Sequence, residues 1–379
     1  MRMARHAPAG RTVPLPRLLG RRANDVPAWH GMERRYFNSG TAALSVALRR
    51  ASAALPAGTT ARVALPAYAC PNLLASVRWA GAEPVYYDLN AESLAGEAGV
   101  LKRWLAAPDV LVVHVDAFGA PSLPEPIGGP RVIHDLAQSY APYELNWRAR
   151  APYSILSFGR AKPLSLTLGG ALLTTSAMTG SAVQDTSDTK GMQPGPDRAR
   201  IAGRAAAYAL SLHPMVFGLL ARIPQLGIGQ THLRALKRVE LWPDSFDALV
   251  QAAISSLRLN MGRWLEDTQA MLRLAQESGG EVPSGVARAA STLPLWRVPI
   301  LCPTAQGAAT LSQEGAHLGI SRLYGCTIPQ MAGTAEREVA ERWPVATSIA
   351  ARLVTLPTHG RLSPRAHEQL RRLLGKIFR

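Results

Sequence analysis

The sequence predicts an α/β fold around a mostly parallel sheet, because short β-type runs alternate with helix-like stretches. The runs lie at 63–67, 84–89, 110–115, 131–135, 153–158 and 171–175. Helix-like stretches lie between several of them, at 71–79 and 93–105. After residue 242 the pattern changes to long helices, expected at 245–276 and 363–377, around a short strand near 295–301. We therefore expect two packed units, as the length of 379 residues also suggests.

The same pattern gives the expected domain limits. Residues 1–30 would be a flexible basic arm, 31–241 a large domain with a helical insertion at about 198–235, and 242–379 a smaller C-terminal domain. The segment 176–197 is rich in Ser, Thr, Gly and Asp, which predicts a mobile loop.

The first helix of the large domain begins with a potential anion site. Asn38-Ser39-Gly40-Thr41 leads into an alanine-rich helical pattern at 42–48. The N–H groups at a helix N-terminus have no partner within the helix, and with a threonine hydroxyl they suit a phosphate group. An ordinary capped helix is the alternative.

An acid and an amine follow two of the predicted strands. Asp135 closes the run 131–135, and Lys162 follows the run 153–158, so both would emerge at the carboxyl edge of the sheet, where ligands bind. A lysine can form a Schiff base with an aldehyde cofactor, and a carboxylate can keep a pyridine nitrogen protonated. Taken singly, the aspartate could be a turn residue and the lysine a solvated one. Together they favour a pyridoxal phosphate site.

These segments resemble the DegT-type family of nucleotide-sugar aminotransferases. The similar stretches occur in the family's order, at 38–44, 65–68, 80–88, 133–138, 157–170 and 352–357. The similarity is close from about 36 to 175, weak from 176 to 345, and returns at the carboxyl terminus. It implies a three-layer sheet of the aspartate-aminotransferase type, a smaller C-terminal α+β domain and a homodimer whose active site is built from two subunits.

The resemblance also assigns roles to individual residues. Lys162 would be the Schiff-base lysine, Asp135 the partner of the pyridine nitrogen, and Gln138 would reach the side of the cofactor's phenolic oxygen. The residues expected to hold the cofactor phosphate are Gly40, Thr41 and Ser157.

The chain departs from the family pattern at several positions. Cys70 stands where the family has an aromatic ring stacked on the cofactor, and Tyr68 is the nearby residue that could replace it. Gly159 replaces a histidine, and Leu168 replaces an acidic residue. Arg160 is an addition that could lower the pKa of the neighbouring lysine by like-charge repulsion or could face solvent.

The charge balance is strongly basic, with 42 Lys and Arg against 26 Asp and Glu and a net charge of +16. No basic run is interleaved with aromatic residues, so no nucleic-acid partner is predicted. A diffuse positive field fits an anionic substrate such as a nucleotide diphosphate sugar, although a generally basic proteome would produce it too.

The cysteines and the amino terminus bear on the compartment. Cys70, Cys302 and Cys326 form no Cys-x-x-Cys pair, so neither a disulfide framework nor a metal site is predicted. Residues 1–22 are rich in Arg and Pro and lack the apolar core of a secretory signal. We expect a cytoplasmic protein.

One segment fits the family poorly. Residues 205–221 carry no Asp, Glu, Lys or Arg and lie between Arg204 and Arg222. Their length approaches that of a membrane span, but His213-Pro214 stands at the middle, where proline would break a helix. A span, a membrane-surface contact and a buried helix pair remain open, and we expect the last, covering the active site or a dimer seam.

The sequence thus predicts a pyridoxal-phosphate-dependent aminotransferase that works through Lys162 in two half-reactions. The expected substrate is a keto-sugar, nucleotide-linked, in polysaccharide biosynthesis. Two alternatives remain: another pyridoxal phosphate reaction on the same scaffold, such as a sugar dehydration, and a cofactor-binding or regulatory protein that has lost catalysis. The sugar, the aminated carbon and the amino donor are left open.

Overall fold

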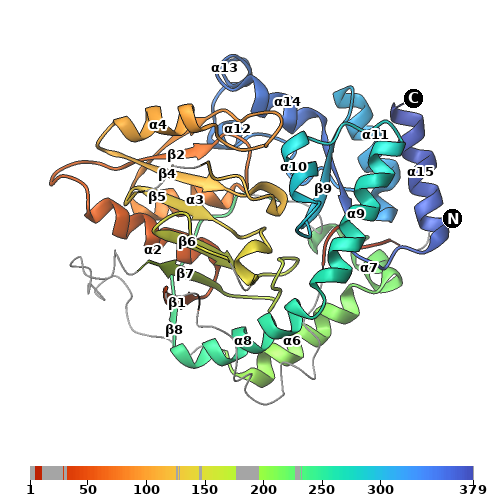
Figure 1. Ribbon diagram of the computed structural model, residues 1–379, viewed down its shortest axis with the longest axis horizontal. Coiled ribbons are helices and arrows are strands. Elements are labelled where there is room, and N and C mark those ends of the chain that lie inside the picture. The colour runs from red at the N-terminus through yellow and green to blue at the C-terminus, as the bar shows by residue number, and fades with distance from the viewer. Residues whose placement is uncertain are drawn as a thin grey trace.

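A single eight-stranded sheet forms the centre of the molecule (Figure 1). The computed structural model describes residues 5–10, 29, 32–124, 127, 129–144, 147–175, 196–226, 231 and 233–378. The strands are β1 Glu33–Phe37, β2 Arg62–Pro66, β3 Glu83–Tyr87, β4 Val110–Val115, β5 Val132–Asp135, β6 Tyr153–Ser157, β7 Gly170–Thr174 and β8 Leu241–Trp242.

The sheet is mostly parallel, as predicted. Its order is β3-β2-β4-β5-β6-β7-β1-β8, and the strands from β3 to β6 pair in parallel. At the other end β7 pairs antiparallel with both β6 and β1, and β8 pairs antiparallel with β1. The sequence pattern did not indicate β1, because Glu33-Arg34-Arg35 breaks its apolar run. The strand nevertheless buries Tyr36 and Phe37, while Arg34 pairs with Asp247 at 2.9 Å.

Helices cover the sheet and close its core. The helices α2 Gly40–Ala53 and α3 Asn72–Ala80 pack on one face, where Leu44 and Leu74 meet Ile133 in a buried apolar cluster. The expected helix 93–105 starts later, as α4 Ala98–Ala106. Residues before it form a turn instead, because the side-chain oxygen of Asn90 accepts hydrogen bonds from the backbone N–H groups of Glu92 and Ser93.

Most of the C-terminal part lies on the right and at the top of Figure 1, and its first helix lies at the bottom. Its elements are α8 Asp247–Arg258, α9 Met261–Glu277, α10 Ser284–Ala289, β9 Arg297–Leu301, α11 Ala305–Gly315, α12 Ile328–Ala332, α13 Glu336–Arg342, α14 Pro344–Arg352, β10 Leu353–Pro357 and α15 Pro364–Phe378. The strands β9 and β10 pair antiparallel. The expectation of one helix at 245–276 was wrong: the helix is interrupted at Asn260, whose side-chain amide donates to the Ser256 carbonyl at 2.8 Å.

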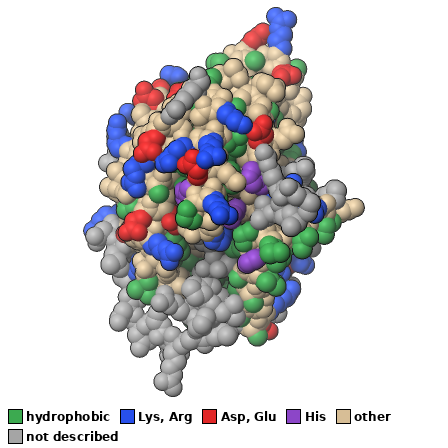
Figure 2. All heavy atoms as spheres, turned by 90° about the vertical axis from the view of Figure 1, so that its right-hand side faces the viewer, with side chains coloured by type: hydrophobic (Ala, Val, Ile, Leu, Met, Phe, Trp, Pro, Cys, Tyr) green, Lys and Arg blue, Asp and Glu red, His purple; other side chains and the backbone are tan. Residues whose placement is uncertain are grey.

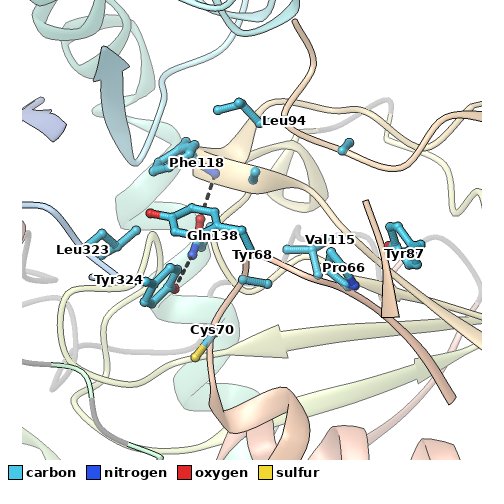
Figure 3. A pocket seen from close by; sticks show the side chains of 13 residues that line it. Pro66, Tyr68, Cys70, Tyr87, Leu94, Val115, Phe118, Gln138, Leu323 and Tyr324 are labelled. Atoms are coloured by element: carbon cyan, nitrogen blue, oxygen red, sulfur yellow. Dashed lines mark hydrogen bonds between the residues drawn. The ribbon is translucent and has the colours of Figure 1, made fainter. Parts of the chain in front are cut away.

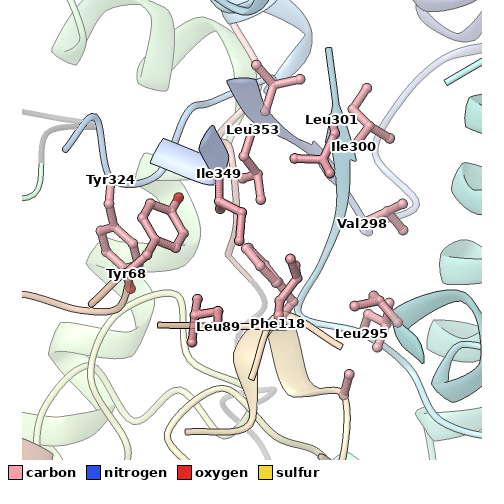
Figure 4. Packing of buried hydrophobic residues seen from close by; sticks show 14 of the residues in the cluster. Tyr68, Leu89, Phe118, Leu295, Val298, Ile300, Leu301, Tyr324, Ile349 and Leu353 are labelled. Carbon is pink, nitrogen blue, oxygen red and sulfur yellow. The ribbon is translucent and has the colours of Figure 1, made fainter. Parts of the chain in front are cut away.

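The two parts share one apolar core. Phe118 and Leu89 from the large part and Val298, Ile300 and Leu353 from the C-terminal part belong to the same buried cluster (Figure 4). Residues that follow the carboxyl ends of the sheet strands therefore pack directly against the second unit.

The insertion consists of two helices, α6 Arg198–Ser211 and α7 Pro214–Leu220. The break falls at His213-Pro214, as expected. No helix within the described residues is long and apolar enough to cross a membrane. Most of the expected loop 176–197 lies outside the described residues. Of the expected arm 1–30, residues 5–10 lie against the body of the protein, with Ala7 buried and the His6 N–H donating to the His317 carbonyl at 2.9 Å.

Candidate active site

The candidate site lies at the carboxyl ends of β5 and β6. Asp135 is the last residue of β5, where it pairs in register with Val115 on one side and Ile155 on the other. Lys162 lies in the loop between β6 and β7, in a turn in which its N–H donates to the Gly159 carbonyl. Two non-glycine residues of this loop have a left-handed backbone conformation, Ala161 at φ 63° and Thr167 at φ 70°. Such a conformation persists only where the surrounding structure holds the backbone in place.

Asp135 is buried, and opposing effects act on the pKa of its carboxyl. Burial raises the pKa of its carboxyl, whereas the Ala137 N–H, which donates to Oδ1 at 2.9 Å, and the positive charge of Lys162 act in the opposite direction. The net pKa is raised. The charge of Lys162 acts on Cys70 as well, so acid, amine and thiol form one electrostatic group.

The start of α2 forms a cradle beside this group. Ser39 caps the helix, and its Oγ accepts from the Ala42 N–H at 3.1 Å. Gly40 follows the cap and lies directly against the end of β6: a Cβ at this position would stand 2.8 Å from the Ser157 Cβ and 3.2 Å from the Ser157 Oγ. Only glycine allows this approach, which brings the helix N-terminus and the Ser157 hydroxyl together. Thr41, half-buried, is the next residue of the helix.

This cradle fits a phosphate group. The first N–H groups of an α-helix have no acceptor within the helix, and the helix dipole favours an anion there. Gly40, Thr41 and Ser157 lie together at the same edge of the sheet as Asp135 and Lys162. Their role as a phosphate site, which the family resemblance implies, stays a prediction.

The second unit reaches the lysine loop through Trp296, a residue that sequence reasoning missed. Its indole N–H donates to the Ala161 carbonyl, and its ring centroid lies 5.3 Å from Lys162 Nζ. The backbone N–H of Trp296 donates to the Phe118 carbonyl at 2.9 Å. A ring in this position attracts the ammonium form of the lysine. The only sequence signal was its place just before the expected strand 295–301.

Gln138 has a different environment from the one expected. Its Oε1 accepts from the Phe118 N–H at 2.8 Å, and its Nε2 donates to the Tyr324 hydroxyl at 3.1 Å (Figure 3). Both ends of the amide are thus engaged by protein groups. Phe118 adopts φ 58°, and Gln138 holds this left-handed turn. The second N–H of Nε2 has no hydrogen-bond partner among the described residues, so the expected contact with a cofactor oxygen stays a prediction.

Tyr324 was also missed by sequence reasoning. Its ring packs against Tyr68, the residue that could replace the family's stacking ring. Tyr68 and Tyr324 meet edge to face, with ring centroids 5.5 Å apart, in a pocket that Cys70 and Gln138 also line (Figure 3). Burial raises the pKa of Tyr68, so its hydroxyl stays neutral. Cys70, not Tyr68, lies within the electrostatic reach of Lys162.

Two neighbouring residues of the lysine loop, Gly159 and Arg160, differ from the family pattern. The Arg160 side chain is exposed, which supports the solvent-facing alternative. Tyr208 of α6 lies beside the same loop, where burial raises the pKa of its hydroxyl to about 12 against the effect of the Ala161 backbone. A Cβ at Gly159 would fit without a clash, in ordinary contact 3.6 Å from the Ser157 Oγ and 4.0 Å from the Lys162 Cγ.

A buried polar network lies near the site. His134 Nε2 stands 3.0 Å from Asp116 Oδ1, which also accepts from the Ser122 N–H and hydroxyl, and His114 Nε2 lies 3.0 Å from the Ser122 Oγ. Burial lowers the pKa of His114 to about 3. Burial also acts to raise the pKa of Asp116, but the charge and hydrogen bond of His134, the charge of His114 and the Ser122 N–H together outweigh it, so the pKa of Asp116 is lowered. The ligand-type atoms of His114, Asp116 and His134 lie within 4.8 Å of one another. Asp116 accepts from Ser122, and His114 contacts the same serine, so we interpret the network as structural support for the ends of β4 and β5. The Nδ1 atoms of His114 and His134 have no hydrogen-bond partner among the described residues.

Comparisons with known proteins agree on the fold. No family model matches the sequence, and no curated protein matches it. Solved structures match it. One of them is a DegT DnrJ EryC1 StrS aminotransferase from Brucella abortus, which aligns over 92% of this chain and 87% of that one at 19% identity with a TM-score of 0.58. DesI, determined in the presence of its TDP-sugar product, aligns over 99% of this chain and 93% of its own at 14% identity, with a TM-score of 0.62. DesV of S. venezuelae, in complex with a ketimine intermediate, aligns over 97% of this chain and 90% of its own at 17% identity, with a TM-score of 0.57.

These alignments span nearly the whole chain, including the region 176–345 in which the sequence resemblance was weak. The similarity stated from the sequence motifs is thus confirmed at the level of structure. The chain has the fold of the DegT-type sugar aminotransferases.

Proposed function

We propose that the protein is a pyridoxal-phosphate-dependent aminotransferase that acts on a keto-sugar. The observation that carries the proposal is the grouping of Lys162 and buried Asp135 beside the cradle at Gly40 and Ser157. Three chemically different requirements of one cofactor, an amine, a carboxylate and a phosphate site, thereby meet at one sheet edge.

Each residue has a defined task in this proposal. Pyridoxal phosphate, when bound, supplies an aldehyde for exchange of amino groups and a pyridinium ring that takes up electron density. Gly40, Thr41 and Ser157 would hold the phosphate. Burial raises the pKa of Asp135, so its ionised form is favoured chiefly when a cation such as a protonated ring nitrogen faces it. Lys162 would bind the aldehyde carbon and, once released, carry the proton between substrate and cofactor carbons.

The substrate class follows from charge and from the structural neighbours. A net charge of +16 favours anionic substrates, and DesI was determined with a TDP-sugar product. We infer that the keto-sugar is nucleotide-linked and that the enzyme works in polysaccharide biosynthesis as a homodimer in the cytoplasm.

Borohydride reduction tests the assignment of the lysine. Protein incubated with pyridoxal phosphate should be yellow, and reduction should fix the cofactor to Lys162 in a mapped peptide. Lys162→Ala should abolish the label, whereas Lys102→Ala, which removes an exposed lysine of α4, should retain it. Label at another lysine, or none with the cofactor in excess, would refute the proposal.

A second candidate is a cofactor-binding or regulatory protein without turnover. It is favoured by Cys70 in place of a stacking ring and by the engagement of Gln138 with Tyr324. The half-reaction with glutamate separates the two: an aminotransferase converts the bound cofactor to its amine form, and a binding protein does not.

A further inference from the structure

The insertion exposes apolar side chains that nothing else in the described structure covers. Leu210 at the end of α6 is 65% exposed, and Met215 and Leu219 of α7 are 65% and 63% exposed. Ile223 and Leu226 continue the series and are also exposed. Figure 2 shows apolar side chains gathered on the lower part of this side of the molecule, with basic side chains beside them.

The exposed positions follow a helical period. Met215 and Leu219 are spaced by four residues within α7, so they lie on one face of that helix, and Ile223 follows shortly after its end. The opposite side of the pair is anchored, because Ala205, Leu212 and Gly218 are buried. The outward face is therefore a second apolar surface of a firmly packed hairpin, not a poorly formed core.

The charges around this surface are of one sign. Between 198 and 226 the sequence holds arginines at 198, 200, 204 and 222 and neither aspartate nor glutamate. Arg204 on α6 and Arg222 after α7 are exposed and flank the apolar positions. The whole chain carries a net charge of +16.

These features distinguish between the conceivable occupants. A membrane span is incompatible with the described helices, none of which is long and apolar enough to cross. A symmetric contact between this segment and the same segment of a second copy would bury the apolar face, but it would add arginines and no Asp or Glu of residues 198–226 to the basic rim. An anionic lipid surface satisfies both the apolar face and the basic rim.

We propose that the α6–α7 hairpin binds the surface of an anionic lipid bilayer, with Leu210, Met215 and Leu219 entering the headgroup boundary and Arg204 and Arg222 contacting lipid phosphates. This differs from the protein-covered helix pair expected from the sequence, because the apolar side chains face outward. The proposal does not depend on aminotransferase activity. It places the lysine loop close to the membrane, since Tyr208 of α6 lies beside Ala161.

Vesicle co-sedimentation of the full chain with bound pyridoxal phosphate tests this. Vesicles of phosphatidylcholine with about 30% phosphatidylglycerol should retain the protein, and vesicles of phosphatidylcholine alone should not. Retention should fall as salt rises. The double variant Met215→Glu/Leu219→Glu should weaken partitioning more than about tenfold, since each side chain loses its apolar burial. Arg204→Gln and Arg222→Gln should each weaken it about fivefold, as expected near an anionic surface.

Matched controls lie elsewhere on the surface. Leu259→Glu changes a leucine that is 72% exposed between α8 and α9, and Arg263→Gln changes an exposed arginine of α9; both should leave partitioning unchanged. Far-ultraviolet circular dichroism verifies that each variant is folded, and the arginine variants test the proposal even if the glutamate pair fails to fold.

Three results would overturn the proposal. The first is failure of the wild type to bind anionic vesicles. The second is equal binding to neutral and anionic vesicles. The third is loss of a dimer, seen by sedimentation velocity, in Met215→Glu/Leu219→Glu without vesicle binding by the wild type, which would assign the surface to a second copy.

Discussion

Replacing Gly40 by alanine would place a methyl group where α2 meets the end of β6. The new Cβ would stand 2.8 Å from the Ser157 Cβ, which is 0.6 Å short of the 3.4 Å at which ordinary contact begins. It would also stand 3.2 Å from the Leu156 carbonyl oxygen and from the Ser157 Oγ. Neither the strand backbone nor the Ser157 Cβ can yield freely, so α2 must shift away from β6.

The expected effects follow from this geometry. Overpacking of a tight site costs about 1–3 kcal/mol, and the higher helix propensity of alanine returns up to about 1 kcal/mol, which leaves a net loss of about 0–2 kcal/mol in the free energy of unfolding when the full return applies. Displacing the Ser157 hydroxyl would remove one hydrogen bond to a charged phosphate, worth about 1.5–3 kcal/mol. The Kd for pyridoxal phosphate should then rise about 10- to 150-fold.

Two measurements separate these effects. Urea unfolding of the cofactor-free protein gives the stability change, and absorbance titration with pyridoxal phosphate gives the Kd. Gly203→Ala in α6 is the matched control, because a Cβ there meets nothing within 4 Å; it should leave the Kd unchanged. If Gly40→Ala matches the wild type in both stability and Kd, the cradle reasoning is refuted.

Three further predictions concern the site and its surroundings. Asp135→Asn should retain the fold and the cofactor but lose most transamination, because an amide cannot hold a pyridinium charge; half-reaction rates within about threefold of wild type, roughly 0.7 kcal/mol, would show that it is not the nitrogen partner. Trp296→Phe keeps a ring near Lys162 but loses the hydrogen bond to the Ala161 carbonyl, so the half-reaction should slow about fivefold, corresponding to one hydrogen bond of ~1 kcal/mol. Trp296→Leu also removes the ring and should slow the half-reaction further; wild-type rates in both variants would show that Trp296 does not position Lys162. Burial, helped by Arg361, lowers the pKa of His359 to about 3 against 6.5 when unfolded, so the unfolded chain binds more protons between these values, and the free energy of unfolding should fall as pH drops from 6.5 toward 3, by up to ~1.4 kcal/mol per unit; His359→Gln should reduce that slope in urea titrations, and an unchanged slope would exclude His359 as its source.

The strands of the sheet could be located from the sequence because each is a short apolar run that ends at polar or turn residues. The run ending at Asp135 became β5, and the run before Lys162 became β6. The antiparallel strand β1 escaped because its arginines interrupt the apolar run. It is stabilised by pairing with β7 and β8, by the ion pair of Arg34 with Asp247 and by the burial of Tyr36 and Phe37. The spacing of apolar residues indicates which residues of one segment are buried, but it does not show which distant segments pack against them.

The same division holds for the site. The sequence by itself determined that Asp135, Ser157 and Lys162 lie at or after the ends of two predicted strands and so share one sheet edge, because the carboxyl ends of parallel strands lie together. The position of Gly40 at that edge depends on β1, which the sequence pattern did not indicate. Only the tertiary structure decided that Trp296 holds the lysine loop, that Tyr324 engages Gln138, and that the apolar face of the insertion points outward. Those contacts join segments far apart in sequence, and they depend on how the second unit and the hairpin pack against the sheet, which no local pattern encodes.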